Sequence, residues 1–174
     1  MKRTLILFFI SFLFNVASFA QPKPEYTISE RKAIKLYEEA IEHYKNRDEV
    51  EAQNVLLNLV GKFPNFAEAH FLLAQTYLDA NQNKEAMIHL NAGIKLHPEI
   101  FPEAYLILAE GYMSESNYKE AEKMISSYLP YPKNDAKMEK RAQLILASCV
   151  FAQRAMESPV PFEPVSMGDG VNSE

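Results

Sequence analysis

The feature that most constrains how this chain folds is an internal repeat of 34 to 35 residues. Matches between the second and third segments, each 35 residues apart, are Leu73 with Leu108, Ala74 with Ala109, Tyr77 with Tyr112, and Ala86 with Ala121. Matches between the first and second segments, each 34 apart, are Ala40 with Ala74, Ala52 with Ala86, Leu56 with Leu90, and Pro64 with Pro98. A repeat of this length is typical of solenoids, in which each unit is one supersecondary motif.

Each unit has the pattern of two amphipathic helices followed by a proline. In the second unit, apolar side chains follow 3–4 spacing over His70–Leu78, and the polar run Asn81–Asn83 interrupts them. The spacing resumes over Lys84–Leu96, and Pro98 ends it. We therefore expect helical hairpins within units of about 33–66, 67–100 and 102–134. Expected N-caps are the polar residues that stand three positions before a Glu, namely Thr27, Asn65 and Asn117.

The pattern resembles the tetratricopeptide repeat (TPR) over about residues 33–132. The second unit supplies His70, Leu73, Ala74, Tyr77, Ala86, Leu90, Gly93 and Pro98, and the third supplies Tyr105, Leu108, Ala109, Tyr112, Ala121 and Ile125. Glu39 and His43 replace expected apolar residues in the first unit, which suits a terminal repeat. The resemblance implies an all-α, right-handed α-α superhelix of about three hairpins plus a C-terminal capping helix, within a domain of residues 29–158.

The same resemblance implies that the first helix of each hairpin lines a concave groove that binds a protein or peptide partner. The groove positions form an apolar and aromatic strip edged by acids, as peptide recognition requires. We call this surface the groove face; its residues are Tyr37, Ile41, Tyr44, Phe71, Gln75, Leu78, Asp79, Leu106, Glu110 and Met113. The groove offers only Lys45 for a carboxylate clamp of the kind that chaperone-tail-binding relatives use. Phe71, Leu78 and Met113 are alternatively core side chains, or are covered by the C-terminal tail.

A final helix is expected over residues 136–157. One apolar stripe can dock on the third hairpin; it consists of Met138, Ala142, Ile145, Cys149, Ala152 and Met156. Leu146, Val150 and Phe151 form a second apolar face. Either this is a capping helix with a wide buried face, or a further element, such as a following domain, packs on Val150 and Phe151.

The first 20 residues have the pattern of a secretory signal peptide, with two positive charges, an apolar run and the small-x-small sequence Ser18-Phe19-Ala20. Cleavage is expected after Ala20, and residues 21–28 would then be a linker. The alternative is an uncleaved anchor, although the stretch is short for a span of about 20 residues. Gln21 stands where a lipoprotein would have Cys. The pattern predicts export to the periplasm or cell envelope, with outer-membrane association one option there.

Charge and motif content argue against several functions. Removal of residues 1–20 leaves 16 basic side chains against 23 acidic ones, a net charge of −7, which disfavours nucleic acid as a partner. The four histidines form no i, i+4 pair and the only cysteine is Cys149, so zinc-binding spacing is missing. No phosphate-binding loop or nucleophile motif is found. We expect no enzymatic activity, no cofactor and no metal.

The last 16 residues, 159–174, change abruptly to proline, glycine and acid. They read either as a disordered tail or as a truncated linker. The stretch from Pro159 to Val165 resembles the junction between TPRs and a β-propeller in Gram-negative envelope proteins that end in an OmpA-like domain. Two functions follow as hypotheses: an exported protein-interaction module, in an outer-membrane or secretion-associated assembly, or a structural spacer in a larger peptidoglycan-linked protein.

Overall fold

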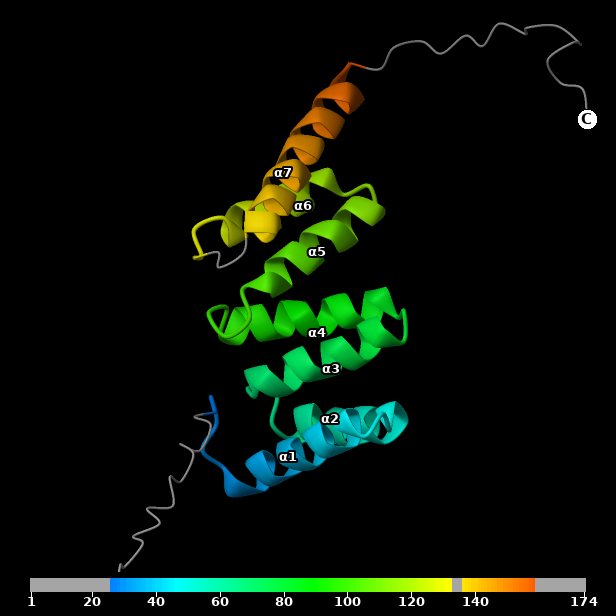
Figure 1. The fold of residues 1–174 in the computed structure, drawn as a ribbon, viewed down its shortest axis with the longest axis vertical. Coiled ribbons are helices and arrows are strands. Elements are labelled where there is room, and N and C mark those ends of the chain that lie inside the picture. The colour runs from blue at the N-terminus through cyan, green and yellow to red at the C-terminus, as the bar shows by residue number, and fades with distance from the viewer. Residues whose placement is uncertain (1–25, 133–135, 159–174) are drawn as a thin grey trace, which may run out of the picture.

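A computed structural model describes residues 26–132 and 136–158. Every regular element in these residues is a helix, and Figure 1 shows them stacked along one long axis. Their bounds are α1 Arg31–Lys45, α2 Glu49–Lys62, α3 Ala67–Asp79, α4 Asn83–Leu96, α5 Glu103–Ser114, α6 Tyr118–Tyr128 and α7 Ala136–Glu157. The expected all-α fold of three hairpins and a final helix is confirmed. The expected signal peptide and the 159–174 tail lie outside the described residues.

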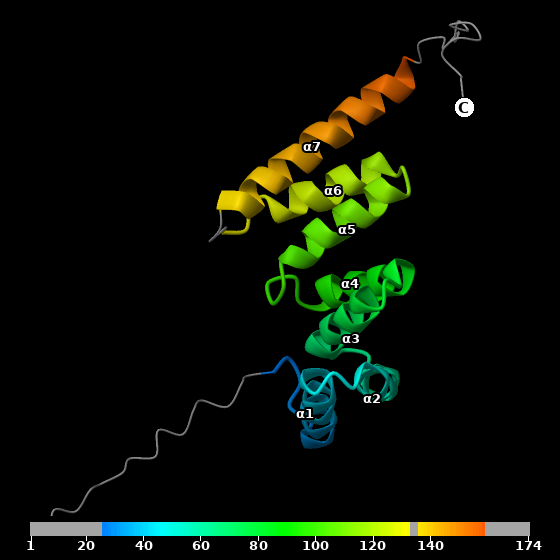
Figure 2. The same cartoon turned by 45° about the vertical axis from the view of Figure 1, so that its right-hand side comes forward.

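The helices pair in chain order as α1 with α2, α3 with α4, and α5 with α6. Each hairpin then packs on the next through α2 with α3 and α4 with α5, and α7 lies along α6. Figures 1 and 2 show the resulting ladder, in which α7 closes one end. Each hairpin packs on its neighbours in the same way, so the first helices α1, α3 and α5 follow one another along the stack and share one continuous face.

The turn inside each hairpin has the same backbone conformation. Arg47, Asn81 and Ser116 adopt the left-handed region, with φ of 63°, 58° and 59°. In each turn the amide of this residue donates to the carbonyl three positions earlier, for example Asn81 N to Leu78 O at 2.9 Å. The three turns lie along one edge of the stack in Figure 1. The repeat in the sequence is therefore also a repeat of one turn geometry.

Small side chains occupy the points where helices cross. The six alanines that define the repeat are fully buried; they are Ala40, Ala52, Ala74, Ala86, Ala109 and Ala121. Glycine permits a closer approach at one crossing, because a Cβ on Gly93 would lie 2.5 Å from the ring of Phe71. Larger buried side chains such as Leu56, Leu73 and Leu108 fill the spaces beside these crossings. This interdigitation of large and small residues produces two core clusters, one between the first hairpin and α3 and one that extends from α3 to α7.

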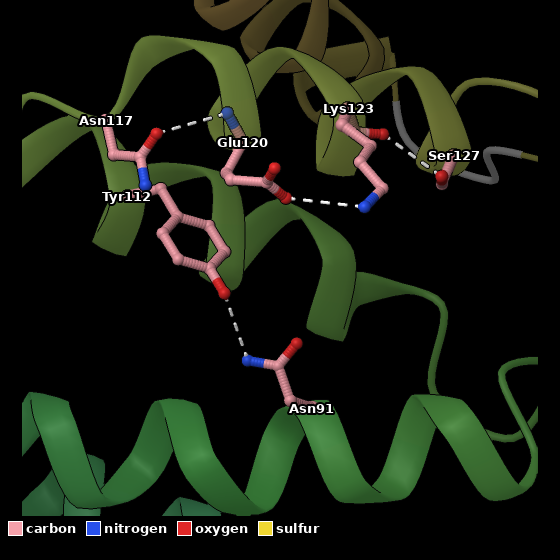
Figure 3. A network of polar contacts seen from close by, with 6 residues as sticks. All are labelled: Asn91, Tyr112, Asn117, Glu120, Lys123 and Ser127. Atoms are coloured by element: carbon pink, nitrogen blue, oxygen red, sulfur yellow. Dashed lines mark hydrogen bonds and ion pairs between the residues drawn. The ribbon is translucent and has the colours of Figure 1, made fainter.

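Polar contacts at the third hairpin include the one expected N-cap that forms. The Asn117 side chain accepts a hydrogen bond from the Glu120 amide at 3.4 Å (Figure 3). Tyr112 reaches α4, where Asn91 Nδ2 lies 3.4 Å from its hydroxyl (Figure 3). The other two predicted caps are wrong. Phe66 takes the N-cap position of α3 in place of Asn65, and Glu30 takes that of α1 in place of Thr27.

The final helix is covered along one stripe and open elsewhere. Ala142, Ile145 and Cys149 are buried against α5 and α6, as expected. Met156, which the sequence pattern places on the same stripe, is 66% exposed and lines a shallow hollow together with Tyr118 and Lys119 at the start of α6. Phe151 is 73% exposed on the second apolar face.

Candidate functional site

The predicted groove residues come from α1, α3 and α5, and the structure divides them into two groups. Eight are at the surface, fully or in part: Tyr37, Ile41, Tyr44, Gln75, Leu78, Asp79, Glu110 and Met113. Phe71 and Leu106 are buried, at 8% and 2% exposed. Phe71 points onto Gly93 and packs edge-on against Phe101, with ring centroids 5.6 Å apart. For these two residues the groove assignment is corrected, and they belong to the core.

One end of the groove face is occupied by the segment that precedes α1. The Thr27 amide donates to Glu68 Oε1 at 2.8 Å, and the Thr27 hydroxyl donates to Glu68 Oε2 at 2.5 Å. Both oxygens of one carboxylate at the start of α3 are therefore used by a single residue. The sequence pattern placed this hydroxyl at a helix cap, so the contact was not foreseen.

An aromatic cluster adjoins this carboxylate. The ring of Tyr26 meets those of Tyr37 and Phe66 edge-on, at centroid distances of 5.4 and 5.9 Å. Tyr37 and Phe66 lie 5.0 Å apart and are tilted by 52°. Burial raises the pKa of Tyr37 well above its usual value, and the charge of Glu68 adds to this effect. The Tyr37 hydroxyl of this cluster therefore stays protonated to a higher pH than an exposed tyrosine.

The middle of the groove face is a side-chain network between the first and second hairpins. The Tyr44 hydroxyl donates to Asp79 Oδ2 at 2.7 Å, and Gln75 Nε2 donates to Asp79 Oδ1 at 2.8 Å. Burial, together with the hydrogen bond to Asp79, raises the pKa of Tyr44 to about 12. The residues sit 35 positions apart on consecutive first helices, so the contact links equivalent faces of two repeats.

At the far end, α7 contributes Arg141, which no sequence pattern indicated as part of the groove. Arg141 donates from Nε and Nη2 to the two carboxylate oxygens of Glu110, each at 2.6 Å. A hollow of about 230 Å³ lies beside this pair, between α3, α4 and α5. Its lining comprises Leu78, Asn83, Met87, Ile107, Glu110, Gly111 and Ser114. This hollow adjoins the groove face at Leu78 and Glu110.

Electrostatically, Glu68 beside the groove face and the two carboxylates of the face itself already have partners within the chain. Glu68 accepts from Thr27, Asp79 from Tyr44, and Glu110 from Arg141. Lys45, the groove's single candidate for a carboxylate clamp, lies 3.1 Å from Glu42 on its own helix. Polar groups with partners in the chain therefore lie beside the apolar side chains of the face, and the charge of Glu110 is balanced by Arg141.

A histidine pair joins the two helices of the second hairpin. His70 Nε2 lies 3.0 Å from the Pro64 carbonyl, so this nitrogen carries the hydrogen. His70 Nδ1 is then the acceptor for His89 Nδ1, 3.1 Å away. The His89 ring also stacks on Tyr77 at 5.6 Å. Burial lowers the pKa of both histidines. In residues 26–132 and 136–158 no group of three or more His, Cys, Asp or Glu side chains could hold a metal ion.

A second surface feature lies on α7. A shallow hollow of about 400 Å³ is lined by Gln143, Leu146, Ala147, Val150, Phe151 and Arg154. Cys149, on the opposite side of the helix, is fully buried, and burial raises the pKa of its thiol. Among the described helices, none has both the length and the apolar character needed to cross a membrane.

Comparison with known proteins agrees with the repeat pattern. The tetratricopeptide repeat family matches residues 44–99. A search of curated proteins found none that matches the sequence. Among solved structures, the first TPR of Spaghetti (RPAP3) bound to an HSP90 peptide is similar at 18% identity and a TM-score of 0.57, over 73% of this chain and 97% of that one.

Two further structures have the same arrangement. The Yersinia enterocolitica type III secretion chaperone SycD, in complex with a peptide of the translocator YopD, is 18% identical, with a TM-score of 0.57 over 73% of this chain and 98% of that one. The Sgt2 TPR domain from Aspergillus fumigatus is 15% identical, with a TM-score of 0.57 over 85% of this chain and 99% of that one. The chain therefore has the all-α fold of a TPR protein.

Proposed function

We propose that this protein is a non-enzymatic TPR scaffold that docks a peptide or protein partner on the groove face. The observation that carries the proposal is that Ile41, Leu78 and Met113 remain partly exposed on three successive first helices, and that Leu78 also lines a hollow of about 230 Å³. Apolar anchors flanked by polar groups supply most of the binding energy in such interfaces. Two similar structures contain bound peptides, which supports this use of the fold.

The charges on the groove face indicate the kind of partner. Asp79 accepts from the neutral side chains of Tyr44 and Gln75 and so keeps its negative charge. Arg141 balances the charge of Glu110, and Lys45 lies beside Glu42. An acidic peptide end would meet like charge here, which opposes binding. We propose a neutral or basic apolar segment as the partner, encountered in the cell envelope after export directed by residues 1–20. Such a partner would fit an outer-membrane or secretion-associated assembly.

Affinity capture from an envelope fraction, with mass-spectrometric identification, tests this proposal. Ile41→Lys with Leu78→Lys should lower recovery of the specific partner by about tenfold, because lysine cannot fill an apolar pocket. The matched control carries Val50→Lys with Ile88→Lys, which change residues that are 73% and 66% exposed on the second helices. Circular dichroism must show that both variants fold. Equal recovery by both variants would contradict docking on the groove face.

A spacer role is the second candidate, and the open face of α7 favours it. Phe151 is 73% exposed next to Val150, beside the hollow of about 400 Å³. We propose that a following domain covers this face in a larger peptidoglycan-linked protein. Reading the gene beyond codon 174 for an in-frame β-propeller tests it. Unrelated sequence after a stop codon would remove this candidate and leave the docking proposal intact.

A further inference from the structure

The end of the groove face nearest the N-terminus already holds a segment of polypeptide. Residues 26–28 precede α1 outside any regular element, and they lie between α1 and α3. Thr27 satisfies both oxygens of Glu68, with its amide at 2.8 Å and its hydroxyl at 2.5 Å. The neighbouring Tyr26 ring packs edge-on against Tyr37 and Phe66. Contacts of this kind do not require that the segment belong to the same chain.

These contacts define what the position selects. One carboxylate can accept from an amide and a hydroxyl of the same residue only if that residue is Thr or Ser. The aromatic ring beside it must be the preceding side chain, because Tyr26 and Thr27 are adjacent. Hydrogen bonds to an ionised carboxylate are stronger than neutral ones, so a segment that lacks the hydroxyl loses one of its two strong bonds to Glu68.

We propose that this end of the groove face is a binding site for an extended segment in which an aromatic residue is followed directly by Thr or Ser, and that residues 26–28 are its built-in occupant. The inference rests on the proposed docking function and names the partner's chemistry. The built-in segment competes with a partner at a high effective concentration, of order millimolar for a short tether. Binding of a partner segment therefore requires residues 26–28 to leave.

A labelled peptide with the sequence of residues 24–30, PEYTISE, tests the site by fluorescence anisotropy on the full chain. The variant Tyr26→Ala with Thr27→Ala empties the position and should bind the peptide at least about tenfold more tightly than the unmodified protein. Adding Glu68→Gln should abolish this gain. The matched control adds Glu103→Gln instead, at the equivalent position 35 residues further on, and should keep it. A peptide with Val in place of Thr should bind about tenfold more weakly.

Several outcomes would overturn the proposal. The emptied variant could remain folded and bind the peptide no better than the unmodified protein, or the Glu68→Gln and Glu103→Gln variants could bind it alike. If the double substitution prevents folding, Thr27→Val alone removes the hydroxyl and should still raise peptide affinity. If the peptide does not bind, but affinity capture still recovers a partner that depends on Ile41 and Leu78, only the site at Glu68 is refuted. Peptide binding without any captured partner would instead count against the docking function.

Discussion

The ring of Phe71 lies so close to the backbone of Gly93 that a Cβ added there would stand 2.5 Å from the ring atom Cε1. The two residues sit on α3 and α4, and their contact sets how closely this hairpin packs. It also explains why Phe71 points into the core and away from the groove face.

Gly93→Ala should therefore destabilise the protein. Relief of the clash requires Phe71 or α4 to shift, and overpacking of this kind costs about 1–3 kcal/mol, partly offset by the better helix propensity of alanine. We expect a net loss of up to about 2 kcal/mol. Urea unfolding followed by circular dichroism measures it. Gly61→Ala is the control, because no atom lies within 4 Å of its added Cβ, and it should stabilise α2 by about 0.5–1 kcal/mol. Similar effects at both sites would contradict the packing argument.

The histidine pair should make stability fall in mild acid. The folded-state pKa values of His70 and His89 lie below the ordinary value of 6.5, so the unfolded chain binds more protons than the folded one. Their contribution is complete above pH 6.5 and is lost as pH falls from 6.5 through the folded pKa values. The Pro64 carbonyl and the Tyr77 ring are the groups that face them. The difference between the urea unfolding midpoints at pH 7.5 and pH 5.5 measures this loss of stability.

His89→Phe keeps a ring against Tyr77 but removes one titrating group and the partner of His70. The difference between the two urea midpoints should be smaller in this variant than in the unmodified protein. An unchanged difference would assign the acid sensitivity to other groups.

Tyr44 and Asp79 should be coupled energetically across the first two hairpins. Each is at the surface, so a coupling of about 0.5–1 kcal/mol is expected for this hydrogen bond. The double-mutant cycle of Tyr44→Phe and Asp79→Ala in urea unfolding measures it. Gln75→Leu should change the free energy of unfolding by less than Tyr44→Phe does, because Gln75 donates to Asp79 from the same helix and does not link the two hairpins. Additive effects of the two substitutions would show that the contact is not formed in solution.

The left-handed turn residues offer a stabilising substitution. Ser116 has φ of 59°, which costs a residue with a Cβ about 1 kcal/mol relative to glycine. Ser116→Gly should raise stability by up to about 1 kcal/mol, less the greater flexibility of glycine in the unfolded chain. Asn81→Gly should change stability less, because asparagine tolerates this conformation. Thermal unfolding of the two variants provides the comparison, and a loss of stability in Ser116→Gly would contradict it.

The buried positions inside each repeat unit could be predicted from the sequence. The repeated alanines are all fully buried, and α7 begins and ends where its apolar pattern does. A 34-residue period determines which side chains meet inside a hairpin, because the same crossing recurs in each unit. Phe71 and Leu106 show the limit of this reasoning, since a consensus groove position cannot reveal how close the facing helix comes.

Contacts made outside the period could not be predicted in this way. Thr27 lies 41 residues from Glu68, and Arg141 lies 31 residues from Glu110. Each joins a repeat helix to a flanking segment whose path is set by packing in three dimensions. The hydroxyl of Thr27 also had a local alternative as a helix cap, which the sequence pattern favoured and the fold did not use.

The burial of Cys149 has a practical consequence. It is the single thiol of the chain, and it is fully buried on the face of α7 that packs on α5 and α6. Its raised pKa leaves little thiolate available. A thiol reagent can reach it only after α7 lifts from α5 and α6. The labelling rate under native conditions therefore measures the opening free energy of this terminal helix separately from global unfolding. The chain carries its own reporter of whether a ligand or neighbour clamps that end of the stack.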